Sequence, residues 1–450
     1  MLQSRCEVYH RKTAAFAREK RVYMEEQIYD KYLEGDNIVY IENEYLKLGA
    51  NLALGGALTY LAEKDKKNLI NSSDWGRQVQ MSFYSYPVPF NPEGSEMADN
   101  WKFIGWNPIQ SGDYYRNRSR VLDYRCENNE IYVKCIPMHW PLNNHPGECT
   151  FEVWYRLDGY CVNVTSRINN ARPDTTQYPA RHQELPAVYT NGEWYRGISY
   201  VGTKPFTNGA LTELVSKDNG LGWPWLTMFP TEGWSALVDD NDYGLGVYIG
   251  STNLSKIGFF GEKGWGGPKD SQTGYIAPLA AEILDHDIVY TYDYSLIVGD
   301  LGFIRSTAQQ KDKSADRRRY TFEKDRNHFY YHNITDKGWR TGGCLEFDFK
   351  AGSELKSPMV FVGCGECNAI ELDSCFDGTV SGEIVFNVYK GLDEKNDGVL
   401  QGETLPFSIS GNGDRAVASI DISGMKDCFI GFSLRFAGEG HLKIYSVELK

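Results

Sequence analysis

Carboxylates, basic groups and aromatic rings occur close together in several short stretches of this 450-residue sequence. In one of them, NLINSSDWGRQVQMSFYSYP at residues 68–87, an acid and an arginine precede two glutamines and two tyrosines: Asp74, Arg77, Gln78, Gln80, Tyr84 and Tyr86. A carboxylate can act as an acid or a base, and guanidinium and amide groups bind hydroxyl oxygens. The stretch therefore predicts a groove for a sugar. Whether Asp74 does acid/base chemistry there or only pairs with Arg77 stays open.

The densest polar and aromatic stretch is ARHQELPAVYTNGEWYRG, residues 180–197. Pro179 and Pro186 argue against a long helix, so we expect an extended loop. Glu184 is followed by apolar residues, and an apolar setting raises the pKa of a carboxyl group toward general-acid work. Glu184 is therefore the first candidate for a catalytic carboxylate, with Asp74 as its partner from a distant segment. We expect substrate contacts from three neighbours: His182, Tyr189 and Trp194.

Two glycine- and proline-containing stretches add rings and amides. GWNPIQSGDYY, residues 105–115, offers Trp106 for stacking and Gln110 for binding hydroxyl groups. GEKGWGGPKDSQTGYIAP, residues 261–278, predicts a long loop over a sheet edge, with Trp265 as a ring for the substrate. An ordinary turn and an ordinary surface loop are the alternatives for these two stretches.

The stretch IPMHWPLNNHPGE, residues 136–148, carries two histidines. We expect His139 at the end of a strand and His145 in a loop. Such a pair can supply a catalytic group and a sugar contact, and a structural role is the alternative. A His-x5-His spacing also suits a metal ion, but no acidic partner stands at a convincing spacing, so no metal is expected.

These stretches are set among β-rich runs separated by turns. TFEVWYRLDGYCVNVTSRI, residues 150–168, is the clearest hairpin, with Asp158 and Gly159 at its turn. A polar, charged stretch near residues 303–320 marks a domain boundary. The expected fold is all-β, in three parts: a helical segment at 1–35, a large β-supersandwich domain at 36–312 and a smaller jelly-roll β-sandwich at 313–450.

The residues GGALTYLAEKDKKNLINSSDWGRQVQ, 55–80, place a strand with paired glycines before a lysine-rich turn and the Asp/Arg cluster. This order resembles the N-terminal region of the galactose mutarotase-like β-supersandwich proteins. The resemblance implies a sugar site in the large domain, with Arg77 as a sugar contact. It also implies that His139 and His145 are the positions in this sequence that best correspond to the mid-chain histidines of that family. The C-terminal sandwich would then be an accessory domain resembling a carbohydrate-binding module.

The composition restricts the partners and the compartment. A net charge of −13 and a pI near 5.2 argue against nucleic acid or an anionic membrane as partner. No run of 18 apolar residues is present to span a membrane. The charged N-terminus does not resemble a secretory signal, so we expect a cytoplasmic protein with ten reduced cysteines. Cys364 and Cys367 form a CxxC pair without a second pair at zinc spacing.

The sequence lacks the common motifs of nucleotide binding, serine hydrolysis and zinc proteolysis. What remains is acid/base chemistry without a cofactor on an oligosaccharide or glycoside. We expect a glycoside hydrolase in which Glu184 and Asp74 form the carboxylate pair, with His139 beside them. One alternative is an aldose epimerase or a polysaccharide lyase of the same fold, the lyase centred on Tyr189 and His139. Another is a non-catalytic carbohydrate-binding protein, and a homo-oligomer is left open.

Overall fold

A computed structural model describes residues 37–214, 225–312, 318–336, 343–362, 367–390, 399–425 and 428–450. The expected N-terminal helical segment lies outside these residues, as do Cys6 and Cys364. Within them almost every regular element is a β-strand, so the all-β prediction is confirmed. The described helices are all too short or too polar to cross a membrane.

The first sheet carries the candidate site, and its strand order is β1-β2-β3-β4-β11-β18-β17-β14. Two short strands, β5 and β8, continue it from β4, so that β5 pairs with both β4 and β8. The bounds are β1 Ile38–Glu42, β2 Leu46–Asn51, β3 Ala57–Glu63, β4 Val79–Ser82, β5 Pro108–Ile109, β8 Met138–His139, β11 Arg181–Asn191, β14 Leu226–Met228, β17 Ser255–Phe260 and β18 Thr273–Glu282.

The second sheet has the order β13-β12-β15-β16-β19-β10-β9-β7-β6. Its bounds are β6 Arg120–Glu127, β7 Glu130–Ile136, β9 Cys149–Asp158, β10 Cys161–Asn170, β12 Arg196–Ser199, β13 Thr212–Leu214, β15 Trp234–Val238, β16 Tyr243–Tyr248 and β19 Val289–Asp300. Strands β9 and β10 form the hairpin expected from the sequence. Asp158 pairs with Cys161, and Gly159 in the turn between them has a φ of 56°, which glycine adopts without strain.

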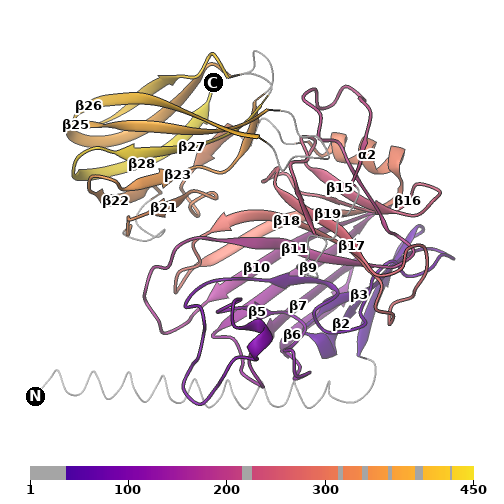
Figure 1. Cartoon of the computed structure of the whole chain (residues 1–450). Coiled ribbons are helices and arrows are strands. Elements are labelled where there is room, and N and C mark those ends of the chain that lie inside the picture. The colour runs from indigo at the N-terminus through magenta and orange to yellow at the C-terminus, as the bar shows by residue number, and fades with distance from the viewer. Residues whose placement is uncertain are drawn as a thin grey trace, which may run out of the picture.

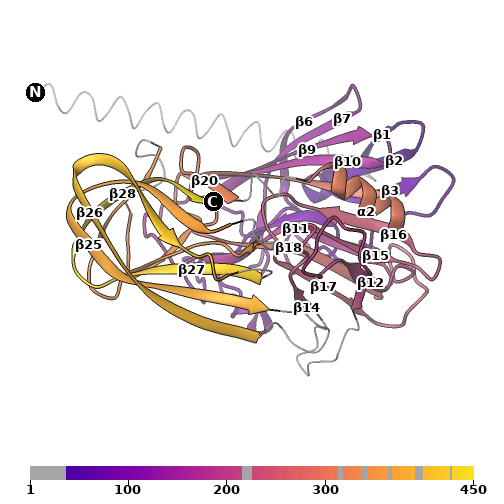
Figure 2. The ribbon, with the colours of Figure 1, turned by 90° about the horizontal axis from the view of Figure 1, so that it is seen from above.

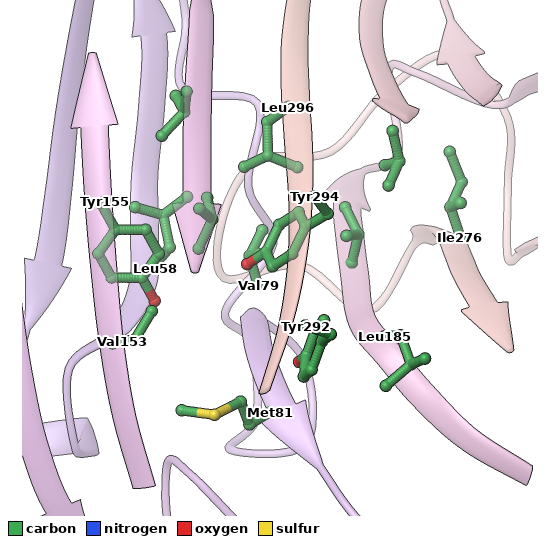
Figure 3. Close-up of a cluster of buried hydrophobic side chains, with 14 of the residues drawn as sticks. Leu58, Val79, Met81, Val153, Tyr155, Leu185, Ile276, Tyr292, Tyr294 and Leu296 are labelled. Atoms are coloured by element: carbon green, nitrogen blue, oxygen red, sulfur yellow. The ribbon is translucent and has the colours of Figure 1, made fainter. Parts of the chain in front are cut away.

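The main core lies between these two sheets, because side chains alternate between the faces of each strand. Along β10 every second residue from Val162 to Ile168 is buried. Strand β4 directs Val79 and Met81 into the same core. Figure 3 shows Met81 and Leu185 of the first sheet near Tyr292 of the second. The opposite face of β4 and β11 is therefore available for a site.

A third sheet forms the C-terminal part of the chain, beside the first two (Figure 1 and, from above, Figure 2). Its bounds are β20 Arg319–Thr321, β21 Tyr330–His332, β22 Leu345–Phe349, β23 Glu354–Lys356, β24 Val360–Val362, β25 Ala369–Lys390, β26 Val399–Asp421, β27 Cys428–Phe436 and β28 Gly440–Leu449. This sheet has a core of its own, which Ile283, just after β18, also joins. The third sheet thus packs against the end of β18.

The expected polar boundary contains a helix, α2 Leu301–Gln310. Asp300 caps it, because its carboxylate accepts a hydrogen bond from the backbone N–H of Phe303 at 2.8 Å. Its own residues Leu301, Ile304 and Ala308 are buried. The last strand of the second sheet ends at Asp300 and the first strand of the third begins at Arg319, and the domain limit at 312/313 stays a prediction.

Candidate active site

A cavity of about 500 Å³ opens on the face of the first sheet that points away from the core. Its walls come from the segment before β4, from β4 and β11, from loops near β5 and β8, and from the ends of β17 and β18. The volume lies within the range of small-molecule sites. The cavity combines ionisable groups, amides and aromatic rings, the chemistry that the sequence predicted for residues 68–87.

Strand alternation and one bulge place the polar residues in this cavity. On β4, Val79 and Met81 enter the core, so Gln80 and Ser82 face the cavity. On β11, Glu184 pairs with Ser82, whereas Ala187 pairs with Gln80. Three residue steps on β11 therefore match two on β4, which is a β-bulge. Because of the bulge, Glu184, Ala187 and Tyr189 all line the cavity.

Glu184 is held by two tyrosine hydroxyl groups. The hydroxyl of Tyr84 donates to Oε2 of Glu184 at 3.0 Å, and the hydroxyl of Tyr275 donates to Oε1. Burial raises the pKa of Glu184, while the hydrogen bond from Tyr275 acts in the opposite direction without cancelling it. A carboxyl group in this setting holds its proton to a higher pH than a free glutamate and can donate it to a substrate.

Asp74 and Arg77 form an ion pair at the same cavity. Nε of Arg77 lies 3.1 Å from Oδ2 of Asp74, and Nη1 donates to the backbone oxygen of Ser271 at 2.5 Å. Oδ1 of Asp74 accepts the backbone N–H of Gly76 at 2.8 Å. The side chain of Asp74 is 43% exposed, so its carboxylate stays accessible to a ligand. The sequence left open whether Asp74 only pairs with Arg77. In the structure Asp74 pairs with Arg77 and also lines the cavity with Glu184.

A turn anchored by Asp113 forms part of the wall. Asp113 is fully buried, and its carboxylate accepts hydrogen bonds from the backbone of Asn117 and Asn144 at 2.8 and 2.7 Å. The turn presents Tyr114 and Arg116 to the cavity. Arg116 has a φ of 71°, a left-handed conformation uncommon outside glycine, which the turn imposes.

Six of the residues predicted for the site line the cavity together: Asp74, Arg77, Gln80, Tyr84, Glu184 and Tyr189. They come from two segments about a hundred residues apart in the chain, which the pairing of β4 with β11 brings together. Their roles in binding or catalysis stay predictions.

The other predicted contacts lie outside the cavity lining, for reasons of packing. Trp106 and Trp194 are 1% and 4% exposed and belong to the main core. Gln78 is buried and donates to the backbone oxygen of Asp74 at 2.6 Å. Gln110 is buried as well, and it accepts from the backbone of Met81 and donates to that of Gly55. These side chains support the fold around the cavity.

His182 and Trp265 also lie outside the lining, although both are exposed. Trp265 donates from Nε1 to Oε2 of Glu262 at 2.9 Å, within its own loop. That loop runs from residue 261 to 272 as expected, but residues 273–278 belong to β18. The stretch 180–197, expected as a loop, is instead mostly strand β11 with the start of β12.

His139 and His145 form a separate cluster away from the cavity lining. His139 is fully buried, and its Nε2 lies 3.0 Å from Oε2 of Glu148. Nε1 of Trp106 donates to the same carboxylate oxygen at 3.2 Å. The rings of the two histidines are 5.6 Å apart. The structure therefore separates His139 from Glu184, since β8 pairs with β5 and not with β11.

Several cavity residues were not among the predicted site residues: Trp101, Asp113, Tyr114, Arg116, Trp140 and Trp225. Tyr275, which bonds to Glu184 from outside the lining, was not among them either. The stretch SGDYYRN, residues 111–117, held a usable signal, because an acid, two tyrosines and an arginine share one glycine turn. Trp101, Trp140 and Trp225 have no such local signal. Within the described residues no three His, Cys, Asp or Glu side chains are grouped to hold a metal ion.

No protein-family model and no curated protein matches this sequence. Among solved structures, the chain is similar to a galactose mutarotase-like protein from Lactobacillus casei, at 12% identity and a TM-score of 0.36, covering 58% of this chain and 99% of that one. A putative aldose 1-epimerase from Escherichia coli K12 matches at 12% identity and a TM-score of 0.36, covering 59% and 100%.

A third similarity is to a family 11 carbohydrate-binding module from Clostridium thermocellum in complex with a mixed-linked tetrasaccharide. It has 14% identity and a TM-score of 0.19, and it covers 27% of this chain and 86% of the module. Identities and TM-scores are low in all three comparisons, so the function proposed below rests on the cavity itself.

Proposed function

We propose that this protein is a carbohydrate-active enzyme, a glycoside hydrolase in which Glu184 is the general acid. The observation that carries the proposal is the pair of unlike carboxyl groups at one cavity. Burial raises the pKa of Glu184, whereas Asp74 is partly exposed and paired with Arg77. Glycoside hydrolysis needs one protonated carboxyl group and one carboxylate.

In this mechanism Glu184 donates its proton to the glycosidic oxygen as the bond to the leaving sugar breaks. Asp74 supplies the negative charge, either by attacking the sugar or by activating a water molecule. Arg77 and Gln80 bind hydroxyl groups of the substrate. Tyr84 and Tyr275 keep the carboxyl group of Glu184 in one orientation through their hydrogen bonds.

Two observations favour hydrolysis over the lyase alternative. Burial, followed by the charge of Glu184, raises the pKa of Tyr84 and of Tyr189 well above the ordinary value, so both hydroxyls keep their protons near neutral pH and neither is available as a base. Among the described residues, no histidine contributes to the cavity lining. A lyase centred on Tyr189 and His139 would therefore lack a ready base at this cavity.

The test is a panel of aryl glycosides, natural oligosaccharides and uronate polymers, with reducing sugar and the absorbance of unsaturated uronates as readouts. We expect reducing sugar without that absorbance. Glu184→Gln and Asp74→Asn should each lower kcat by about 100-fold or more. Glu44→Gln, on the exposed turn after β1, is the matched control and should leave kcat unchanged. Rising absorbance, or a fully active E184Q, would overturn the hydrolase proposal.

A further inference from the structure

The order of the strands places cavity residues on both sides of Glu184. Across the first sheet the strands run β8-β5-β4-β11-β18-β17-β14, and Glu184 lies on β11. Trp140 directly follows β8, and Trp225 directly precedes β14. Each is three strands away from β11 in the order of the sheet, and the two lie on opposite sides of it. Both tryptophans nevertheless line the same cavity as Glu184, so this cavity extends along the sheet in both directions.

On the β8 side, the wall is a cluster of three rings. Trp101, Tyr114 and Trp140 contact one another edge to face, with ring centroids 5.7–6.0 Å apart. Trp101 ends the short helix η2, Asp99–Trp101, and Tyr114 belongs to the turn anchored by Asp113. We call this group the β8-side cluster.

On the β14 side, a second group of rings surrounds Tyr275. The rings of Tyr189 and Trp225 lie 4.8 and 4.7 Å from that of Tyr275. Tyr189 and Trp225 line the cavity, and Phe260 at the end of β17 adds another exposed ring. We call Tyr189, Trp225, Phe260 and Tyr275 the β14-side cluster.

Aromatic rings are the surfaces on which the C–H faces of sugars pack. Trp140 and Trp225 lie on opposite sides of β11 in the strand order, so we expect one sugar ring to pack on only one of the two clusters. The groups that could cleave a bond, Glu184 and Asp74, line the part of the cavity formed by β11 and the segment before β4. The β8-side and β14-side clusters therefore suit two sugar units joined near Glu184.

We propose that the cavity binds a glycan of at least two sugar units, one on the β8-side cluster and one on the β14-side cluster, with their linkage at Glu184. This proposal rests on the proposed function and specifies the size of its substrate. It excludes a monosaccharide as the substrate that fills the cavity. It also assigns Trp101 and Trp225 as binding residues of different subsites.

Binding to the Glu184→Gln variant tests the proposal without turnover. The probe is an array of mono- to tetrasaccharides of glucose, galactose, mannose, xylose and their uronic acids, followed by titration of the best binder and its monosaccharide. We expect the disaccharide to bind at least about tenfold more tightly than the monosaccharide, because a second stacking contact is added. Equal affinities would overturn the proposal, and this comparison needs no change to any aromatic residue.

Substitutions then separate the two subsites. In the Glu184→Gln background, Trp101→Ala and Trp225→Ala should each weaken disaccharide binding by about tenfold, whereas only one of them should weaken monosaccharide binding. Phe303→Ala, an exposed ring on α2 outside the cavity, is the control and should change neither affinity. A disaccharide affinity that depends on one tryptophan alone would contradict the two-subsite proposal.

The outcomes also separate this proposal from the proposed reaction. Stepwise gain of affinity with chain length, without release of reducing sugar by the unchanged protein, would overturn hydrolysis and support the two-unit site. Hydrolysis of aryl monosaccharides with no gain from a second sugar unit would support the reaction and overturn the two-unit site. No detectable binding to any member of the array would overturn both the proposed reaction and the two-unit site.

Discussion

At the scale of single residues, Glu184 lies where burial destabilises the charged form of its carboxyl group. Burial raises its pKa above the ordinary 4.5, even though tyrosine hydroxyls bond to both of its oxygens. The folded protein therefore holds this proton over a pH range in which the unfolded chain releases it. Stability from this group is fully present below pH 4.5 and is lost as pH rises through the folded pKa.

Glu184→Gln should remove the loss of stability that accompanies the ionisation of Glu184, because an amide does not ionise. We expect the free energy of unfolding of E184Q, relative to that of the unchanged protein, to rise as pH increases from 4.5 toward neutrality. Urea unfolding at a series of pH values measures the free energies of unfolding of E184Q and of the unchanged protein. Glu44→Gln should run parallel to the unchanged protein, because Glu44 is exposed. A constant difference between E184Q and the unchanged protein would contradict the raised pKa.

At the scale of elements, the turn at residues 113–117 depends on one buried carboxylate. The side chain of Asp113 accepts from the backbone N–H and the side-chain amide of Asn117 and from the backbone N–H of Asn144. Asp113→Ala removes three hydrogen bonds to a charged acceptor, each worth about 1.5–3 kcal/mol. We expect urea unfolding to report a loss of at least about 2 kcal/mol. Glu127→Ala, at the exposed end of β6, is the comparison and should cost much less.

The sequence predicts elements well where alternation is regular, and less well where a bulge interrupts it. The β9–β10 hairpin follows directly from its alternating pattern and its Asp-Gly turn. Strand β11 was expected as a loop because of Pro186. That proline lies within the bulge between Glu184 and Val188, where the regular pairing with β18 is interrupted. The bulge is also what places Glu184 and Ala187 on one face, and no local pattern announces it.

The candidate site was also predicted only in part. Asp74, Arg77 and Glu184 were found from residue types in polar stretches, and all three line the cavity. Trp106 and Trp194 have equally polar neighbours but lie in the core. An indole side chain fits a core and a sugar site equally well, so only tertiary packing decides between them. Three tryptophans that do line the cavity lie at the end of η2, just after β8 and just before β14, and their proximity depends on strand order.

At the scale of the whole molecule, Arg326 joins the third sheet to the first two. It is 1% exposed; its Nε lies 2.7 Å from Oδ2 of Asp336, and its Nη2 contacts Asp285, which follows β18. Removing one partner leaves buried charges uncompensated, so Arg326→Ala should cost about 3–5 kcal/mol. The control is Arg415→Ala, whose ion pair with Asp373 is at the surface, so its loss should cost much less. Equal losses in chemical unfolding would mean that Arg326 does not carry the junction.

His328 makes the same junction sensitive to pH. Its Nδ1 contacts Oε1 of Glu282, the last residue of β18. Burial alone would lower the pKa of His328, but the charges of Glu282 and Asp325 outweigh burial and raise it above 6.5. The folded state thus favours the protonated imidazole. Its contribution to stability is fully present below pH 6.5 and is lost as pH rises through the folded pKa.

His328→Gln should therefore abolish part of the pH dependence of unfolding on the alkaline side. Between pH 6 and 9 we expect the unchanged protein to lose stability relative to H328Q, because only the unchanged protein gives up a proton from the junction. His332→Gln, on an exposed position of β21, is the matched control and should follow the unchanged protein. Parallel urea-unfolding curves for H328Q and the unchanged protein would contradict the charged pair. A selective loss in the unchanged protein would instead mean that alkaline pH weakens the contact between the third sheet and β18, the strand that also carries Tyr275, a hydrogen-bond partner of Glu184.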